Sequence, residues 1–416
     1  MMKPLHEDWI AVIIAFLTIA LVCAGLHPAL PKFASWNNSA ALWAQLSRAE
    51  LLLQAGVLFL WVLGSLLLAR ALAKDLQPVK LALSLLGIVV ISLLAQLITS
   101  NRLVKDLGIE VVLFSLLLGL FISNVLGVPA WLKPAIQTEL FIKIGLVLLG
   151  ANVLFGDVIS AGGLGLLQSV IVVFAVWYFT FWLCKRFGLD DEFRMMISSA
   201  VSICGVSAAI ATSGAIEGDN RKLSHVISLV LIIAIPMMLF MPYIAAWAGM
   251  TPAVAGAWLG GTIDTSGAVV AAGTLMGEEA LKYATLVKFS QNVLLGLAAF
   301  FISLYWTLSK KEVSAEQKPG LKTIWERFPK FVLGFVLASL LFSFVLPPAV
   351  VSTAKGSLKE LQTYWFALAF TCIGLETKFT DIFTMENGRP AIAFIIAQLF
   401  NIFFTLAVAY LVFGGL

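Results

Sequence analysis

Long apolar runs alternate with short polar segments along almost the whole chain. About 20 apolar residues are needed for a helix to cross a bilayer, and about 11 of the runs approach or exceed that length. These predicted spans occupy residues 9–30, 50–73, 79–100, 109–127, 138–155, 162–187, 222–247, 281–308, 328–346, 358–377 and 390–413.

Two further segments, 195–216 and 253–275, are apolar but rich in glycine and other small residues. The first contains Ser202-Ile203-Cys204-Gly205-Val206-Ser207-Ala208, and the second contains Gly260-Gly261-Thr262-Ile263-Asp264-Thr265-Ser266-Gly267. Such stretches suit places where a helix breaks and its backbone groups face a protein-lined cavity instead of lipid. We therefore expect two broken or re-entrant segments.

The composition sets the fold class. Of the 416 residues, 61% are hydrophobic and only 12% are charged, which predicts an all-α polytopic membrane protein with the lipid bilayer as its main partner. The net charge of +4 is explained by basic cytoplasmic loops, so no nucleic-acid partner is expected. The four scattered cysteines show no metal-binding spacing. The sequence leaves open whether the protein forms a homo-oligomer.

Basic residues indicate the orientation of the chain. The polar stretch 309–330 carries six lysines and arginines and should be cytoplasmic, which places the N-terminus inside and the C-terminus outside a bacterial inner membrane. Arg221 and Lys222 fall inside only if segment 195–216 enters and leaves from the cytoplasm as a hairpin. Segment 253–275 would then dip in from outside. The alternative is that both segments cross fully.

The chain also contains an internal repeat. Residues 121–126 (FISNVL) match 341–346 (LFSFVL), and the region 149–158 matches 373–382, with Asp157 opposite Asp381. Helices 109–127, 138–155 and 162–187 would correspond to 328–346, 358–377 and 390–413 in opposite orientation. We therefore predict inverted, circularly permuted repeats over 109–249 and 251–413, preceded by N-terminal helices in 1–100. Chance similarity between apolar helices is the alternative.

The motifs of soluble enzymes are missing: there is no Walker loop, no dinucleotide fingerprint after a strand and no His-Glu-x-x-His. We expect no enzyme, no cofactor and no metal site. Charges at membrane depth point to function instead. Asp264, with the hydroxyls of Thr262, Thr265 and Ser266 around it, suits a sodium or proton site. Alternatively, Asp264 caps the helix that begins at Thr265.

The other candidates are polar groups that could bind a substrate. A half-helix beginning in the first small-residue segment would attract an anion through its exposed N–H groups. Lys288 has Gln291 and Asn292 three and four positions on, hence on the same helix face; alternatively, Lys288 extends to the membrane surface. The predicted substrate-binding residues are Ser202, Cys204, Gly205, Ser207, Thr212, Ser213, Lys288, Gln291 and Asn292. Asn152 and Glu376, at equivalent repeat positions, are added to the ion-coupling candidates.

Four short runs in and after the two small-residue segments resemble a known family. The run Ile203-Cys204-Gly205-Val206-Ser207-Ala208-Ala209-Ile210-Ala211, together with Val269-Val270-Ala271-Ala272-Gly273, Gly277-Glu278-Glu279-Ala280-Leu281 and Val287-Lys288, is similar to the sulfate exporter family of YeiH-like bacterial membrane proteins. The resemblance covers about 109–413 and implies anion export, nominally of sulfate. The chain departs from the family pattern in having Asp264-Thr265 in place of a His-Glu pair and Gln291 in place of an arginine.

The sequence thus predicts an ion-coupled secondary transporter of a small anion (sulfate, a sulfonate or a carboxylate), coupled to Na⁺ or H⁺ and working as an exporter. A sodium/proton antiporter-like carrier is the first alternative, because it also uses carboxylates within the membrane. A channel or a non-transporting membrane scaffold is the second.

Overall fold

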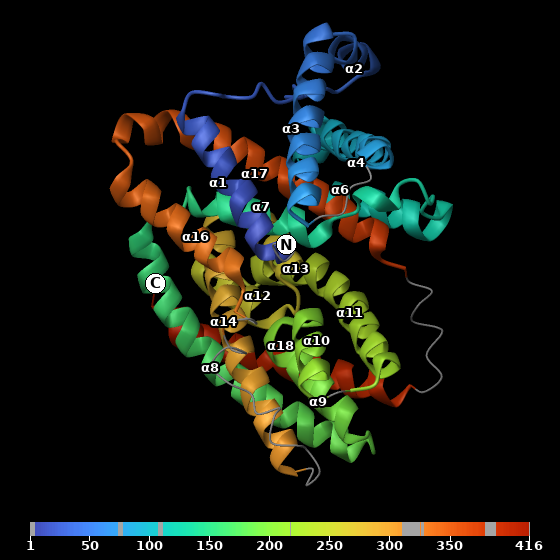
Figure 1. Cartoon of the computed structure of the whole chain (residues 1–416), viewed down its shortest axis with the longest axis vertical. Coiled ribbons are helices and arrows are strands. Elements are labelled where there is room, and N and C mark those ends of the chain that lie inside the picture. Colours follow the sequence, from blue (N-terminus) through green and yellow to red (C-terminus); the bar gives the residue numbers. More distant parts are fainter. Residues whose placement is uncertain are drawn as a thin grey trace. The chain divides into compact units, whose positions relative to one another are not determined.

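A computed structural model describes residues 5–73, 78–106, 111–216, 218–309, 325, 328–378 and 388–415 (Figure 1). Within these residues the chain is helical apart from one isolated bridge between Trp36 and Asn101. Six helices are long and apolar enough to cross a membrane, and several shorter apolar helices accompany them. The chain divides into two compact units: residues 1–156 with 330–378, and residues 157–329 with 379–416.

The first unit contains the helices of the N-terminal region and, from each predicted repeat, the first two of the three helices that match. Its helices are α1 (Glu7–Cys23), α2 (Ser39–Leu46), α3 (Ala49–Ala73), α4 (Pro78–Thr99), α5 (Arg102–Asp106), α6 (Val111–Phe121), η1 (Ile122–Leu126), η2 (Lys133–Ala135), α7 (Thr138–Gly150), α16 (Lys330–Leu340), η5 (Leu341–Val345) and α17 (Pro348–Glu376).

The second unit contains the remaining helices and both small-residue segments. Its helices are α8 (Phe155–Arg186, beginning at the unit boundary), α9 (Asp191–Ser199), η3 (Ala200–Cys204), α10 (Val206–Ile216), α11 (Asn220–Trp247), α12 (Pro252–Thr262), α13 (Ser266–Met276), α14 (Glu278–Ser309) and α18 (Arg389–Phe413).

Most predicted spans coincide with helices, but several bounds differ. The helix predicted at 138–155 ends at Gly150, and the one predicted from 162 begins at Phe155. The short helix α2 was not expected. The predicted loop 309–330 lies mostly outside the described residues, and so does the repeat match 379–382 that contains Asp381.

Close helix packing in the first unit depends on two glycines at equivalent positions of the predicted repeat. A Cβ at Gly374 of α17 would lie 2.4 Å from the Leu116 carbonyl oxygen of α6, and a Cβ at Gly150 of α7 would lie 2.3 Å from the Phe335 carbonyl oxygen of α16. Helices can approach this closely only where a small residue stands at the crossing. The two helix pairs, α6 with α17 and α7 with α16, are therefore built alike.

The matching sequences 121–126 and 341–346 also share an uncommon local structure. Each contains a five-residue π-helix, η1 and η5, that ends its helix. Single π-turns are rare in proteins and often mark functional positions. The side chain of Asn124 in η1 donates to the Thr377 carbonyl (3.0 Å), and Ser343 Oγ in η5 accepts from the Phe155 amide (3.0 Å). The shared π-helix is consistent with an internal repeat, whereas the two hydrogen bonds come from positions that do not match, since Asn124 is opposite Phe344 and Ser343 is opposite Ser123.

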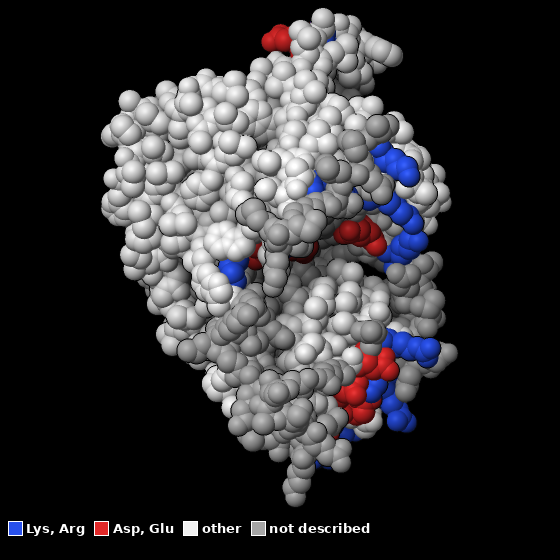
Figure 2. Space-filling model, in the orientation of Figure 1, with Lys and Arg blue, Asp and Glu red and all other residues white. Residues whose placement is uncertain are grey.

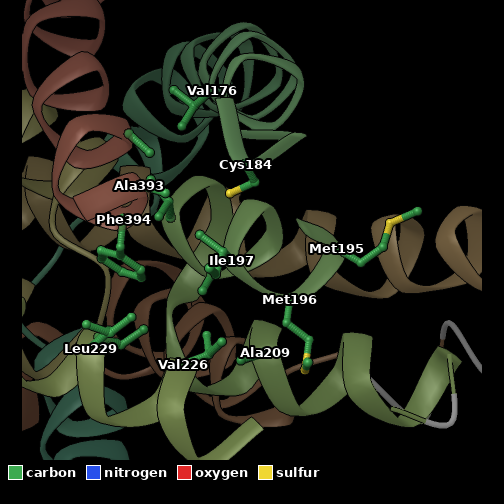
Figure 3. Close-up of a cluster of buried hydrophobic side chains, with 14 of the residues drawn as sticks. Val176, Cys184, Met195, Met196, Ile197, Ala209, Val226, Leu229, Ala393 and Phe394 are labelled. Atoms are coloured by element: carbon green, nitrogen blue, oxygen red, sulfur yellow. The ribbon is translucent and has the colours of Figure 1, made fainter. Parts of the chain in front are cut away.

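An apolar core joins α8, α9, α10, α11 and α18 in the second unit. Its side chains include Val176, Met196, Ala209, Val226 and Phe394, which converge from five helices in Figure 3. Burying such side chains contributes roughly 1.5–3 kcal/mol each for the larger ones. This core includes side chains of α9 and α10 and so holds the first small-residue segment in place.

The first small-residue segment forms a hairpin whose first and last residues lie close together. Lys222, at the start of α11, contacts Asp190 (2.9 Å) and Glu192 (3.2 Å) at the start of α9, and the Asp219 amide donates to Glu192 (3.1 Å). The base of the hairpin therefore joins the beginning of α9 to the end of α10. Figure 2 shows acidic and basic side chains gathered over this region. We call α9, η3 and α10 the first hairpin.

The ion pair between Lys222 and Asp190 at the base of the hairpin also affects the pKa of Asp190. Burial by itself would raise the pKa of Asp190, but hydrogen bonds from Lys222 and from the backbone amides of Phe193 and Glu192 hold that pKa below its usual value. Asp190 is consequently ionised at neutral pH and keeps its bond to Lys222.

The second small-residue segment is also a hairpin. A Cβ at Gly256 of α12 would lie 2.4 Å from the Ala280 carbonyl oxygen, and one at Gly273 of α13 would lie 2.9 Å from Leu281 Cα. Both the start of α12 and the end of α13 thus lie beside the first turns of α14. We call α12 and α13 the second hairpin. Of the two alternatives left open by the sequence, the structure has the hairpins.

The packing of α6 against α17 yields a testable prediction. Gly374→Ala should lower the free energy of unfolding by about 1–3 kcal/mol, because the added methyl group overpacks a tight crossing. The matched control is Gly356→Ala in the same helix, where a Cβ would meet nothing within 4 Å. That change should be neutral or stabilise by up to about 1 kcal/mol through helix propensity. Thermal unfolding of the purified protein in detergent measures both, and equal melting temperatures for the two variants would contradict the packing argument.

Candidate functional site

The tips of the two hairpins lie against each other inside the second unit. Helix α11 connects the base of the first hairpin to the base of the second, and its 28 residues span about 42 Å. The hairpins therefore enter from opposite ends of α11. Their tips are residues 201–205 and 261–265, and a Cβ at Gly205 would lie 3.1 Å from the Cβ of Asp264.

Each tip is a helix break with a local cause. The first hairpin turns at Gly205, whose φ of 60° and ψ of −114° favour a residue without a side chain. The second hairpin leaves its helix at Ile263, where the backbone becomes extended, and re-enters a helix at Ser266. Breaks of this kind release carbonyl groups from their helical hydrogen bonds, and buried carbonyls need other donors.

Lys288 of α14 supplies donors to both tips. Its Nζ lies 2.8 Å from the Ile203 carbonyl oxygen in the first tip and 2.9 Å from the Ile263 carbonyl oxygen in the second, and 3.1 Å from Gln291 Oε1. The side chain is 2% exposed. The interpretation of Lys288 as a lysine that extends to the membrane surface is therefore wrong, because its ammonium group is fully committed inside the protein.

A second side chain, Asn401 of α18, joins the tips from another helix. Its amide nitrogen lies 3.1 Å from the Val201 carbonyl oxygen and 3.2 Å from the Thr262 carbonyl oxygen. The Thr405 hydroxyl donates to Asn401 Oδ1 (2.8 Å) and orients the amide. Gln398, one turn earlier, also donates to the Thr262 carbonyl (2.9 Å). Asn401 and Lys288 thus link the two tips independently.

Further amides serve the second hairpin alone. Gln291 Nε2 donates to the Gly261 carbonyl (2.8 Å), and Gln168 of α8 donates to the Ala257 carbonyl (2.8 Å). Asn292 donates to the Ser266 hydroxyl (3.1 Å). The tips are consequently surrounded by a network of amide and ammonium donors from three helices.

Asp264 is the exception in this network. Its side chain is 1% exposed, and among the described residues it is the one carboxylate whose two oxygens are both buried without a hydrogen-bond partner. Lys288 lies close enough to attract it electrostatically, and the Gln398 amide also lies near it, yet the hydrogen bonds of Lys288 and the short contacts of Gln398 Nε2 go to other atoms. A buried, unpaired carboxylate is costly, so this group marks the centre of the candidate site.

The capping role considered for Asp264 belongs to its neighbour. Thr265 is the N-cap of α13, and its hydroxyl accepts from the Ala268 amide (3.2 Å). The interpretation of Asp264 as a helix cap is therefore wrong, and its carboxylate has no structural task in this helix.

The structure brings most of the candidate residues together at the tips. Lys288, Gln291, Asn292 and Asp264 converge there, and the remaining tip residues are Ser202, Cys204, Gly205, Thr262, Thr265 and Ser266. Ser202 uses its hydroxyl on the Ser198 carbonyl of its own helix (2.7 Å).

Other candidates lie elsewhere. Ser213 donates to the Gly218 carbonyl (3.5 Å) near the base of the first hairpin, and Thr212 is its neighbour in α10, so the structure places both outside the tips. Ser207 is exposed. Asn152 and Glu376 belong to the first unit, where their partners are Gln362 (3.3 Å) and Thr138 (2.7 Å).

Sequence reasoning missed the polar face of α18. Gln398, Asn401 and Thr405 follow the spacing i, i+3 and i+7 in an otherwise apolar helix, which places them on one side. That pattern was available in the sequence. Gln168 carried a weaker signal, as a single amide in an apolar run.

The donor chemistry of the site favours small ions over transition metals. Among the described residues no three His, Cys, Asp or Glu side chains are grouped so that they could hold a metal ion. The site instead offers carbonyl oxygens, one carboxylate and one ammonium, together with the N-terminal ends of α10 and α13. Broken helices with such ends bind ions and charged substrates in membrane carriers.

Comparison with known proteins identifies relatives of the chain. Residues 83–394 match the family model described as conserved hypothetical protein 698. A UPF0324 membrane protein of Rhodopirellula baltica is 40% identical over 85% of this chain and 68% of its own length. Another, of Nitratidesulfovibrio vulgaris, is 38% identical over 80% of this chain and 60% of its own length. No solved structure matches the chain.

The tight packing around Gly205 at the first tip yields a prediction. Gly205→Ala should lower the free energy of unfolding through backbone strain of about 1–3 kcal/mol and by a further penalty of about 1–3 kcal/mol for overpacking, because its Cβ would lie 2.7 Å from Val230 Cγ1.

The matched control for this change is Gly277→Ala, which also has a positive φ of 101° but nothing within 4 Å. This control should show the backbone strain alone. Chemical denaturation of both variants in detergent measures the difference, and a Gly205→Ala protein as stable as the control would refute the tight packing around Gly205.

Proposed function

The chain belongs to the family of conserved hypothetical protein 698, a family of membrane proteins, and we propose that it is an ion-coupled secondary transporter of a small anion. The observation that carries this proposal is the buried, unpartnered carboxylate of Asp264 at the meeting point of two helical hairpins. A fold gains nothing in stability from such a group, so its place at a helix break favours a role in moving ions.

The charges at the tips support an anionic substrate. The N-terminal ends of α10 and α13 both lie at the tips, and each carries a partial positive charge from its helix dipole. The ammonium of Lys288 adds a full positive charge, which Asp264 balances when it is ionised. When Asp264 is neutralised by a proton or a bound cation, the tips become net positive, and an anion can bind there. Ion and substrate binding would thereby be linked.

The arrangement of the chain supports a carrier more than a channel. Paired glycine contacts and paired π-helices in the first unit are consistent with inverted repeats, which are frequent in secondary transporters. In such a carrier one unit moves against the other to open the site to each side in turn. We place the protein in the inner membrane, with its N-terminus cytoplasmic and its C-terminus outside, on the basis of the basic loops.

The substrate class within this proposal follows from the resemblance to sulfate exporters. Sulfate, sulfonates and carboxylates share an anionic oxygen cluster, which helix N-termini and a lysine can bind. An enzyme finds less support, because the sequence contains no Walker loop, no dinucleotide fingerprint after a strand and no His-Glu-x-x-His motif.

A sodium/proton antiporter-like carrier is the second candidate. The same carboxylate favours it, because two competing cations could alternate at Asp264. The two candidates differ in whether an anionic substrate is required. Exchange of sodium for protons in proteoliposomes that contain no anionic substrate favours the antiporter.

The substrate is identified first. Purified protein is screened by thermal shift against sulfate, sulfonates, carboxylates, sodium and pH, because a ligand that binds only the folded state raises its apparent stability. A specific, saturable rise with one anion supports the proposal, and the absence of any anion response refutes the anionic substrate.

Asp264→Asn then tests the coupling role. The variant should fold and insert normally, since the hydrogen bonds of Lys288 and Asn401 to the tips do not involve Asp264. Flux of the identified anion into proteoliposomes should be lost or should no longer depend on the ion gradient. The matched control is Asp157→Asn, a half-exposed carboxylate paired with Lys282 (3.2 Å), which should transport normally. Wild-type flux with unchanged ion dependence in Asp264→Asn would refute the coupling role of Asp264.

A further inference from the structure

We propose that the ammonium of Lys288 is a resident monovalent cation, occupying the position between the hairpin tips where sodium would otherwise bind, so that the coupling ion is a proton carried by Asp264. This inference rests on the proposed transport function and names its coupling ion. It assigns Lys288 as the residue that determines ion specificity.

The ammonium has the oxygen surroundings of a cation site. Three oxygens lie around Nζ: two main-chain carbonyls from helix breaks at 2.8 and 2.9 Å and one side-chain amide at 3.1 Å. Carbonyls released by broken helices are the ligands that membrane carriers use for sodium. An ammonium group has three N–H donors, and each has one of these oxygens. The site is therefore already filled.

The covalent attachment of this cation makes it permanent. Lys288 is held on α14, which packs closely along both arms of the second hairpin through Gly256, Gly260 and Gly273. A free ion would have to bind the same carbonyls next to a fixed positive charge. At a separation of a few ångströms in a low-dielectric interior, that repulsion is severe. Sodium is thus excluded from the carbonyls.

What remains for ion coupling is the carboxylate. Among the described residues, the titratable group that interacts with Asp264 is Lys288 from α14, and Lys288 in turn interacts with Cys204 from η3. The polar side chains that α18 presents to the tips are uncharged: Gln398, Asn401 and Thr405. A proton needs no set of oxygen ligands beyond the carboxylate itself, and binding it leaves the bonds of Lys288 unchanged. The geometry therefore suits a proton at Asp264.

The test compares the stability of the full-length protein in different salts. The melting temperature of the wild-type protein in detergent is measured in sodium, potassium and choline chloride at equal ionic strength, and 22Na⁺ binding is measured in parallel. We expect no sodium-specific rise in melting temperature and no saturable binding of 22Na⁺. A sodium-specific rise or saturable binding overturns the proposal.

Removing the tethered cation should create a site for a free one. Lys288→Ala leaves the carbonyls of Ile203 and Ile263 without their donor, so methylammonium or sodium chloride should raise the melting temperature of this variant by several degrees in a saturable manner. The matched control is Lys282→Ala, a lysine on the same helix that is paired with Asp157 at its edge. This control should show no such response.

The outcomes decide the proposal in each case. A folded Lys288→Ala protein that responds to no small cation, or a Lys282→Ala protein that responds equally, overturns it. If Lys288→Ala does not fold, Lys288→Gln replaces it: its side chain keeps an amide donor, and the wild-type sodium measurements still decide the matter by themselves.

Transport assays separate this inference from the proposed function. In proteoliposomes that contain the identified anion, a proton gradient should drive flux and a sodium gradient should not. Flux driven by sodium overturns the inference and leaves the transporter standing. Absence of flux with every gradient counts against the transporter, while the stability measurements continue to report on Lys288.

Discussion

Carbonyl groups released at two buried helix breaks determine how the second unit is built. An unpaired peptide carbonyl in an apolar interior costs several kcal/mol, and the two tips present several of them close together. Lys288 and Gln291 on α14, with Gln398 and Asn401 on α18, supply the donors. These two helices are thereby fixed to both hairpins by polar contacts, in a protein whose lipid environment gives helices little hydrophobic reason to associate.

Satisfying the carbonyls leaves the carboxylate unsatisfied. Most donors that the structure aims at the tips end on carbonyl, amide or hydroxyl oxygens, and Asp264 is left with the nearby charge of Lys288 and the nearby amide of Gln398. Replacing a buried charge by an apolar residue is often neutral or stabilising, so stability alone gives no reason for an aspartate here. The same network that joins the two tips thus leaves the carboxylate of Asp264 without a close donor, which is consistent with the ion-coupling role proposed for it.

Much of this arrangement was predictable from local sequence. The small residues around Gly205 and Asp264 identified the breaks, because few other sequences are compatible with interrupted helices in a membrane. The spacing of Lys288, Gln291 and Asn292 placed them on one face, and the structure has them at the same tip. The cap was less predictable: Asp264 and Thr265 are both good N-caps, and only the backbone geometry assigns that role to Thr265.

Long-range contacts account for what the sequence left open. Hairpins and full crossings differ in where each segment ends, and here that depends on Lys222 meeting Asp190 and Glu192 across about 30 residues of chain. The donors on α18 are more distant still, since Asn401 lies 200 positions from Val201. Patterns within one helix show that a polar face exists, but they do not show which broken helix the face will meet.

The position of Lys288 is itself set by small residues on α12 and α14. Gly256 lies against Ala280, and Gly260 lies against Ala284 one helical turn further along both helices, so α12 and α14 run parallel. The next residue in the series on α14 is Lys288, four positions beyond Ala284, and it meets the point where α12 has ended and the Ile263 carbonyl is free. A larger side chain at either glycine would push the helices apart and move the ammonium away from both tips. The glycines therefore influence the candidate site from a distance, because they fix the position of Lys288 along the hairpin.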